Sequence, residues 1–213
     1  MANAILENKK VSISTKNDKM GRVHSVSLPP VTTCKNWQRC MNAKGDLICY
    51  AVRMYKNKHY GSIKKAYDRN LEILQADRKS YFLQIQADAM LQRFFRWHVS
   101  GDIIDIDYLD NMVKIARSCK GTTFMAFTKN YEDVNEYLTS HKLPKNLKLI
   151  FSLPFDGATI DNPHNLPTAA VILNGQEPDE SWKICGGCCE ECACRGVGCW
   201  ELKKGETIAF DEH

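Results

Sequence analysis

Between residues 94 and 173 the chain alternates short apolar segments with longer amphipathic ones, and this alternation constrains the fold more than any other feature. Strands that alternate with helices form parallel sheets whose crossovers are right-handed. Strands that are apolar almost throughout are typical of a sheet covered on both faces. We therefore predict an α/β fold with a partial (β/α) barrel-like parallel sheet. The predicted strands are 94–100, 122–128, 147–153 and 168–173, and the predicted helices are Ile106–Cys119 and Glu132–Ser140.

The residues before this core predict an N-terminal β-hairpin followed by two helices. Residues 11–14 and 23–28 have strand patterns, and Pro29-Pro30 ends the second strand because proline cannot donate to a β-ladder. From Ser62 to about Arg93 an amphipathic stripe indicates two helices, with Ser80 as the N-cap of the second.

At 213 residues the chain is expected to form a single domain. Its parts are the hairpin with a cysteine-containing loop (1–49), the α/β core (50–174), and a cysteine-rich segment (175–213) that ends with a strand at 207–210. Residues 181–200 show little helix or strand character. No apolar run is long enough to span a membrane, and the first residues are polar and acidic where a signal peptide is apolar. We therefore expect a cytoplasmic protein with no membrane partner.

Six of the ten cysteines lie between residues 185 and 199. In a reducing compartment, clustered cysteines are more often metal ligands than disulfides. Thiolate-rich sites select iron–sulfur clusters or zinc, and crowding of more than four cysteines favours iron–sulfur over a zinc ribbon. The segment is therefore predicted to be a metal-binding loop, in which glycines allow the left-handed turns that two adjacent Cys-x-x-Cys pairs need. The candidate ligands are Cys185, Cys188, Cys189, Cys192, Cys194 and Cys199.

A second group of three cysteines lies in the N-terminal loop at Cys34, Cys40 and Cys49. Their spacing matches no common zinc template. Three cysteines without a fourth are typical of an iron–sulfur site that keeps one iron open. Two alternatives remain: the two groups share ligands in space, or these residues are small buried hydrophobes. The isolated Cys119 is interpreted as a core residue.

Polar residues follow three of the predicted strands, and Ser152, Asp156 and Gly157 come at the end of the strand at 147–153. Ser100, Gly101 and Asp102 come after the strand at 94–100, and Lys129 and Asn130 come after the strand at 122–128. The carboxyl ends of parallel strands meet at one edge of the sheet, where such folds keep their sites. This Ser-Gly-Asp turn is suited to hold an amine or a ribose, with the Asp102 carboxylate as the acceptor. His98 is expected to be a core histidine with satisfied hydrogen bonds.

A basic stretch gives an alternative function. It is either a solvated helix face or a surface that contacts phosphates. The net charge of +4, from 29 basic and 25 acidic residues, is too balanced to indicate nucleic acid by itself. The basic residues are Arg53, Lys56, Lys58, His59, Lys64 and Lys65.

Several segments resemble, in order, the bacteriophage family called gene product eighty-eight. They are SLPPVTTC followed by CYA, RWHVSGD, FMAFTKNY, and a cysteine cluster that ends in CW, so the resemblance covers nearly the whole chain. It implies a phage-encoded protein in the cytoplasm of the infected bacterium, and the family's cysteine pattern suggests an iron–sulfur cluster. The chain departs from the family pattern in a longer spacing between Cys40 and Cys49 and in extra C-terminal cysteines.

More distantly, the chain is similar to radical SAM proteins, which have three N-terminal cysteines before a (β/α) barrel. That similarity implies a [4Fe–4S] cluster on Cys34, Cys40 and Cys49, whose open iron binds S-adenosylmethionine. It also implies that Ser100–Asp102 bind the amine of this cofactor and that Lys129 or Asn130 lies near a small-molecule substrate. The spacing of the three cysteines differs from the usual pattern of three and then two intervening residues.

The leading hypothesis is therefore a phage-encoded iron–sulfur protein with one [4Fe–4S] cluster, or two if both cysteine groups bind one. It takes an electron from a donor and either passes it on or acts as an enzyme of the radical SAM type. The alternatives are a zinc-binding module that contacts nucleic acid, and an α/β protein in which the cluster is structural.

Overall fold

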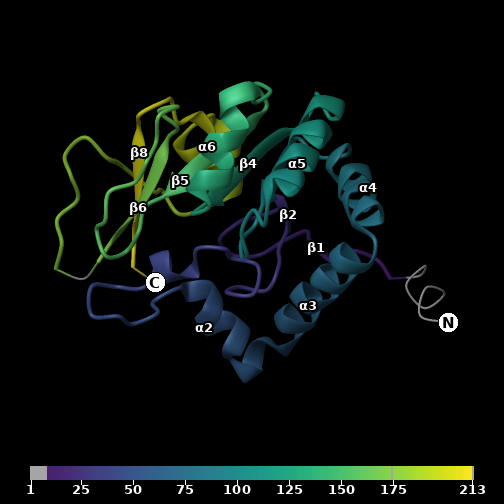
Figure 1. The fold of residues 1–213 in the computed structure, drawn as a ribbon, viewed down its shortest axis with the longest axis horizontal. Helices are drawn as coiled ribbons and strands as arrows, with labels where there is room; N and C mark the ends of the chain where they lie inside the picture. The colour runs from purple at the N-terminus through teal and green to yellow at the C-terminus, as the bar shows by residue number, and fades with distance from the viewer. Residues whose placement is uncertain (1–8, 174, 213) are drawn as a thin grey trace.

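A mostly parallel sheet forms the centre of the computed structural model, which describes residues 9–173 and 175–212 (Figure 1). In these residues the sheet has eight strands in the order β1-β2-β3-β4-β5-β6-β8-β7. β1 and β2 pair antiparallel, as the predicted hairpin requires, and the other neighbouring strands are parallel. The strands are β1 (Ile13–Ser14), β2 (His24–Val26), β3 (Phe94–Trp97), β4 (Thr123–Thr128), β5 (Leu147–Ser152), β6 (Thr168–Ile172), β7 (Lys183–Ile184) and β8 (Thr207–Asp211).

The order of the strands confirms the predicted α/β fold. β2 to β6 follow one another across the sheet in chain order, which is the arrangement of strands in a (β/α) barrel. No helix in the described part of the chain is long and apolar enough to cross a membrane. The helices are α2 (Tyr50–Lys56), α3 (Gly61–Ala76), α4 (Arg78–Ala89), α5 (Ile106–Ser118), α6 (Tyr131–Ser140) and α7 (Cys189–Arg195), with short 3-10 helices η1 (Trp37–Cys40), η2 (Lys58–Tyr60) and η3 (Gly198–Glu201).

The pleat of the strands sends alternate side chains to opposite faces of the sheet, and each face has its own apolar core. On the outer face, Phe124 and Phe151 belong to a core that includes side chains of α3, α4, α5 and α6. On the inner face, Met125 and Ile150 belong to a second core that includes Trp200 of the cysteine-rich segment. The C-terminal segment therefore covers the face of the sheet that the helices leave free.

Side-chain caps set the start of three helices. The Asp77 carboxylate accepts a hydrogen bond from the Ser80 backbone N–H at 2.9 Å, and Asp105 and Asn130 cap α5 and α6 in the same way. The prediction that Ser80 is the N-cap of α4 is wrong, because the extended backbone at Asp77 places the cap three residues earlier.

The prediction that residues 181–200 lack regular structure is also wrong, because they contain β7, α7 and η3. The helix α7 has only seven residues, too few to be stable alone in water. It is held by contacts from distant segments: the Trp200 indole N–H donates to the Cys189 carbonyl at 3.1 Å, and Cys189 and Ala193 are buried against Met20. Gly196 ends α7 in the left-handed conformation, with φ of 62°.

The chain turns sharply after β3, which therefore ends earlier than predicted. His98 has φ of 56° and Gly101 has φ of 83°. A Cβ atom on Gly101 would lie 2.8 Å from both Leu28 Cβ and Thr33 Oγ1, in the segment that follows β2. Only glycine combines this backbone conformation with so close an approach.

Replacing Gly101 by alanine is expected to lower the free energy of unfolding by about 2–3 kcal/mol, because left-handed strain adds to a collision with Leu28. Gly121→Ala is the control, because nothing lies within 4 Å of its added Cβ and its φ is not left-handed. It should change the unfolding free energy by less than about 0.5 kcal/mol. Urea unfolding followed by circular dichroism measures both, and equal values for the two variants would contradict this account of the turn.

His98 is buried in the core as predicted, but its ring nitrogens lack the expected hydrogen bonds. Only 3% of the residue is exposed, its ring stacks on Trp97, and neither ring nitrogen has a hydrogen-bond partner. Burial lowers the pKa of His98 to about 3 from its ordinary value near 6.5. The folded protein therefore holds a neutral imidazole under conditions in which the unfolded chain is protonated.

Stability is therefore expected to fall as the pH drops below about 6.5, since only the unfolded chain binds this proton. The loss is up to about 1.4 kcal/mol per pH unit. His98→Asn, which tolerates a left-handed backbone, should show a shallower acid-side decline. The control is His59→Asn, because His59 is exposed on η2 and should leave the decline unchanged. If the unfolding free energies of His98→Asn and of the unmodified protein fall equally with decreasing pH, His98 is not the group responsible for the decline.

Candidate metal centres

Five of the six C-terminal cysteines line one pocket on the inner face of the sheet, which we call the thiol pocket. Cys185 follows β7, and its N–H donates to the Ala209 carbonyl of β8 at 2.9 Å. Cys189 and Cys192 lie three residues apart in α7, so both face the same side of the helix. The thiol pocket contains Cys185, Cys188, Cys189, Cys192 and Cys199.

Cys194 is the predicted ligand that the structure does not bring to the thiol pocket. It is exposed on α7 and does not line the pocket. Cys119 is buried at the end of α5, as expected for a core residue. All ten cysteines are free thiols. The C-terminal cysteines therefore form a cluster that could bind a metal.

Two cationic side chains approach the sulfur atoms of the thiol pocket. The Arg96 Nη1 lies 3.8 Å from the Cys189 Sγ, and the Lys19 Nζ lies 3.9 Å from the Cys185 Sγ. Arg96 forms no ion pair with a carboxylate in the described residues, and its Nε is buried without a hydrogen-bond partner. Burial raises the pKa values of Cys192 and Cys199, the latter to about 12, and the Arg96 guanidinium opposes this rise for Cys199. Cations in this position would offset part of the negative charge of thiolates that bind a metal.

A glycine turn allows Cys192 to lie where it does. Gly198 has φ of 67°, and a Cβ atom there would lie 3.2 Å from the Cys192 Sγ. Gly196 has nearly the same conformation, with φ of 62°, but nothing lies within 4 Å of its added Cβ. Of these two turn glycines, only Gly198 makes room for a sulfur atom.

The N-terminal turn at residues 17–22 forms hydrogen bonds to α7. The Glu190 carboxylate accepts hydrogen bonds from the Arg22 backbone N–H at 2.9 Å and from the Arg22 Nε at 2.7 Å. Gly21 is required there, because an added Cβ would lie 2.4 Å from the Glu190 Oε2. The Cys189 N–H also donates to the Lys19 carbonyl at 2.9 Å. Residues 17–22 therefore meet the cysteine-rich segment at the thiol pocket.

The three N-terminal cysteines lie in the segment between β2 and α2. The Cys40 thiol donates a hydrogen bond to Cys49, which lowers the pKa of Cys49 to about 6 and raises that of Cys40. Burial raises the pKa of Cys34 to about 12, and the charges of Asp102 and Cys49 raise it further. These interactions place the three thiols near one another and near the carboxyl ends of β3 and β4.

Asp102 is buried between these two strand ends. Its Oδ1 accepts from the Ile103 N–H at 2.7 Å and its Oδ2 from the Lys129 N–H at 2.9 Å. Burial raises the pKa of Asp102 to about 6, although the hydrogen bonds act in the opposite direction. The carboxylate therefore fixes the backbone of Lys129 and lies beside Cys34.

Ser100 and Gly101 attach the same turn to the segment that follows β2. The Ser100 hydroxyl donates to the Leu28 carbonyl at 3.0 Å, and the Leu28 N–H donates to the Ser100 carbonyl at 3.0 Å. The Ser27 hydroxyl accepts from the Ser100 N–H at 3.3 Å. Both residues therefore serve the geometry of the turn, which brings the strand end that bears Asp102 to the cysteine loop.

Lys129 and Asn130 have different surroundings. The Lys129 ammonium donates to the Ser152 carbonyl at 3.2 Å and lies 4.3 Å from the centre of the Phe155 ring. Burial lowers the pKa of Lys129, while Cys40, Asp102 and Cys49 raise it, so the ammonium lies among the site residues. Asn130, in contrast, is fully buried, caps α6 and donates to the Ile103 carbonyl at 3.0 Å.

Tyr50 interacts electrostatically with one residue of each cysteine group. It follows Cys49 in the chain, and its hydroxyl donates to the Val99 carbonyl beyond β3. Burial raises the pKa of Tyr50, and the thiolates of Cys49 and Cys189 raise it further, whereas Arg96 lowers it. The charges of both cysteine groups therefore act on the phenol.

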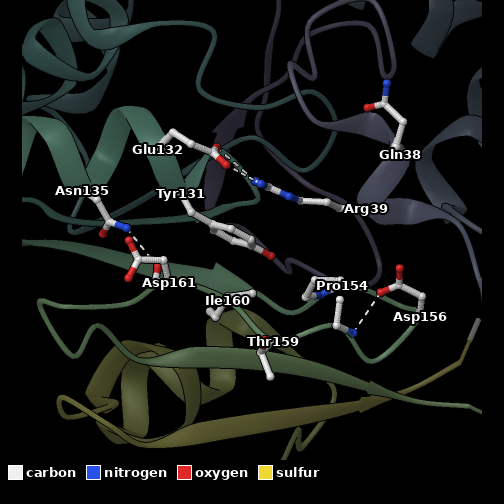
Figure 2. Close-up of a pocket in the computed structure, with 11 residues that line it drawn as sticks. Gln38, Arg39, Tyr131, Glu132, Asn135, Pro154, Asp156, Thr159, Ile160 and Asp161 are labelled. Atoms are coloured by element: carbon white, nitrogen blue, oxygen red, sulfur yellow. Dashed lines mark hydrogen bonds and ion pairs between the residues drawn. The ribbon is translucent and has the colours of Figure 1, made fainter.

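A polar pocket of about 550 Å³ opens beside the N-terminal cysteines (Figure 2). Tyr131, Glu132 and Asn135 of α6 form one wall, and residues 154–161 form another. Arg39, next to Cys40 in the chain, extends over the Tyr131 ring at 4.3 Å and forms an ion pair with Glu132. The position at the carboxyl end of a parallel sheet is where such folds bind ligands.

The donor atoms of both cysteine groups suit a soft metal or an iron–sulfur cluster. Within residues 9–173 and 175–212, no three His, Cys, Asp or Glu side chains are already assembled around one ion position. The feature that fits a metal is the donor set: five thiols in one pocket beside two cations, and three thiols beside a buried lysine.

A comparison with family models identifies the family of this chain. The model described as Gene product 88 matches residues 2–206. The chain belongs to the gene product 88 family. No curated protein and no solved structure matches it. The predicted family resemblance is thus confirmed for this gene product 88 member, whereas similarity to radical SAM proteins stays a prediction.

The basic stretch lies on α2, η2 and the start of α3, which form a V-shaped projection in Figure 1, and α2 begins directly after Cys49. Lys64 forms an ion pair with Asp68, and its ammonium lies over the Tyr55 ring. Arg53, Lys56 and Lys58 are exposed and form no ion pair in the described residues.

Sequence reasoning missed Arg96, Arg39 and Tyr50. Arg96 had a detectable signal, because a charged residue inside an otherwise apolar strand needs a partner on one face of the sheet. Arg39 and Tyr50 adjoin Cys40 and Cys49, but nothing in the local sequence indicates which way their side chains point.

Replacing Gly198 by alanine is expected to weaken metal binding at the thiol pocket about tenfold, because the new methyl group displaces the Cys192 sulfur. Titration of the metal-free protein with Co²⁺ measures this, since thiolate-to-cobalt absorption reports the ligands directly. Gly196→Ala is the matched control, because it adds the same backbone strain without touching a sulfur. Equal cobalt affinity in the two variants would contradict a ligand role for Cys192.

Proposed function

We propose that this protein is an iron–sulfur protein with two centres. In this proposal a [4Fe–4S] cluster occupies the thiol pocket, and a second cluster, held by Cys34, Cys40 and Cys49, keeps one iron open. The observation that carries the proposal is the thiol pocket itself, in which five thiols meet a half-buried Arg96 that has no carboxylate partner in the described residues. Clusters are held by thiolates, and nearby cations offset the negative charge of the loaded site.

The N-terminal centre is the proposed reactive centre. When bound, the cluster supplies an electron to S-adenosylmethionine or to another acceptor. The Asp102 carboxylate accepts a hydrogen bond from the ammonium group of the cofactor. Its fixed position beside Cys34 supports this role. Lys129 contributes positive charge next to Cys40 and Cys49, which favours their thiolate forms.

The thiol pocket is proposed to pass electrons to the N-terminal centre or to stabilise the C-terminal segment. Tyr50 supports a link between the two centres, because the charges of Cys49 and Cys189 both add to the rise that burial causes in the pKa of its phenol. The inner-face core around Trp200 excludes water from one side of the pocket. A protected, low-dielectric setting is one of the means by which proteins tune cluster potentials.

Protein purified without oxygen should contain about eight iron and eight acid-labile sulfide per chain, four for each cluster. Cys192→Ser and Cys40→Ser should each lose about four of both, since each removes a ligand from one centre. Cys194→Ser is the matched control for Cys192, because both lie on α7 but Cys194 is outside the pocket. Cys119→Ala is the control for Cys40 and should keep the full content.

Different outcomes overturn different parts of the proposal. Iron and sulfide that survive Cys40→Ser would remove the N-terminal cluster and leave the C-terminal one. Zinc without sulfide would replace the iron–sulfur proposal with the zinc-binding alternative, for which the unpaired basic residues on α2 and η2 supply a surface for nucleic acid.

A further inference from the structure

We propose that the polar pocket beside Arg39 binds a small molecule or a peptide side chain that carries an amine or a guanidinium group. The pocket encloses about 550 Å³, enough for a ligand of several heavy atoms. Its walls are α6, the segment that follows β5, and η1, so the ligand would lie at the carboxyl edge of the sheet (Figure 2).

The residues that line this pocket carry more negative than positive charge. Glu132, Asp156 and Asp161 contribute three carboxylates, and Arg39 is the lining residue that carries positive charge. Neither Asp156 nor Asp161 forms an ion pair within the described part of the chain. The Asp156 carboxylate accepts a hydrogen bond from the Ala158 N–H at 3.0 Å, but neither carboxylate is neutralised by a cationic side chain, so both could pair with a bound cation.

Arg39 is not available to bind an anion. Its guanidinium pairs with Glu132, donates to the Lys129 carbonyl and lies over the Tyr131 ring. These three contacts use its charge, both terminal nitrogens and one of its flat faces. An anionic ligand would have to displace Glu132, whereas a cationic ligand leaves the pair intact.

A third observation concerns hydrogen bonding. Asn135 lines the pocket, and its Nδ2 donates to the Asp161 carbonyl at 2.9 Å. Its Oδ1 is buried and has no hydrogen-bond partner. This oxygen is sealed from solvent, so the selection of a ligand rests on the carboxylates, which accept hydrogen bonds from an N–H donor with positive charge, as in an amine or a guanidinium.

This inference deepens the proposed function, because the pocket adjoins Cys40 and the Lys129 backbone and would hold the substrate of the N-terminal centre. The binding itself rests on the pocket alone. Arg39 connects the two places, since it lines the pocket, contacts the Lys129 carbonyl and precedes Cys40 in the chain. The substrate class is therefore a cationic amine or guanidinium compound.

The test is a binding titration of the whole chain, monitored by two-dimensional NMR, with L-arginine amide and L-lysine amide as probes. The neutral L-norleucine amide serves as the comparison. Both cationic probes should bind at least about tenfold more tightly than the neutral one. Asp156→Asn and Asp161→Asn should each weaken cation binding about two- to fivefold, and the double variant by about tenfold or more.

Glu136→Gln is the matched control, because Glu136 lies on α6 beside Asn135 but does not line the pocket. It should bind the cationic probes as the unmodified protein does. Equal affinity for the neutral and cationic probes, or equal losses in Glu136→Gln and the aspartate variants, would overturn the inference.

The same samples separate this inference from the proposed function. Cys40→Ser, whether or not it has lost iron, should still bind the cationic probes, since no pocket residue has changed. A protein that binds iron but no cationic probe overturns the inference and leaves the iron–sulfur proposal standing. A protein that binds the probes but holds no iron overturns the iron–sulfur proposal and leaves the inference standing.

Discussion

The buried carboxylate of Asp102 holds together the edge of the sheet on which the rest of the site depends. Its two oxygens accept hydrogen bonds from Ile103, in the segment between β3 and α5, and from Lys129, which directly follows β4. A buried carboxylate is costly unless such donors surround it. The Thr128 side chain also hydrogen-bonds to this carboxylate, so donors from both segments offset the cost of burial and fix the main chain beside the cysteine loop.

The alternation of apolar segments and helices was sufficient to predict the sheet, because both faces of a parallel sheet must be covered. Local signals were weaker guides elsewhere. The N-cap of α4 is Asp77 and not Ser80, a shift that depends on backbone conformation and not on residue type alone. α7 was missed because its stability comes from Met20 and Trp200, which are distant in sequence or follow the helix.

The candidate site was predictable in kind but not in geometry. Clustered cysteines indicated metal chemistry, but only the fold shows that Cys194 points away from the other five. The N-terminal cysteines have irregular spacing because the loop that bears them follows the edge of the sheet, where no helix or strand period applies. The role of Arg96 is similarly spatial, since its contact with Cys189 crosses from β3 to the C-terminal segment.

The contacts between residues 17–22 and α7 have a consequence for folding. The Arg22 N–H and the Glu190 carboxylate that it bonds are 168 residues apart in the sequence, and the Lys19 carbonyl bonds to Cys189 over a similar separation. Contacts between such distant segments slow folding. Until they form, the inner face of the sheet, with Met125 and Ile150, exposes apolar surface that promotes aggregation.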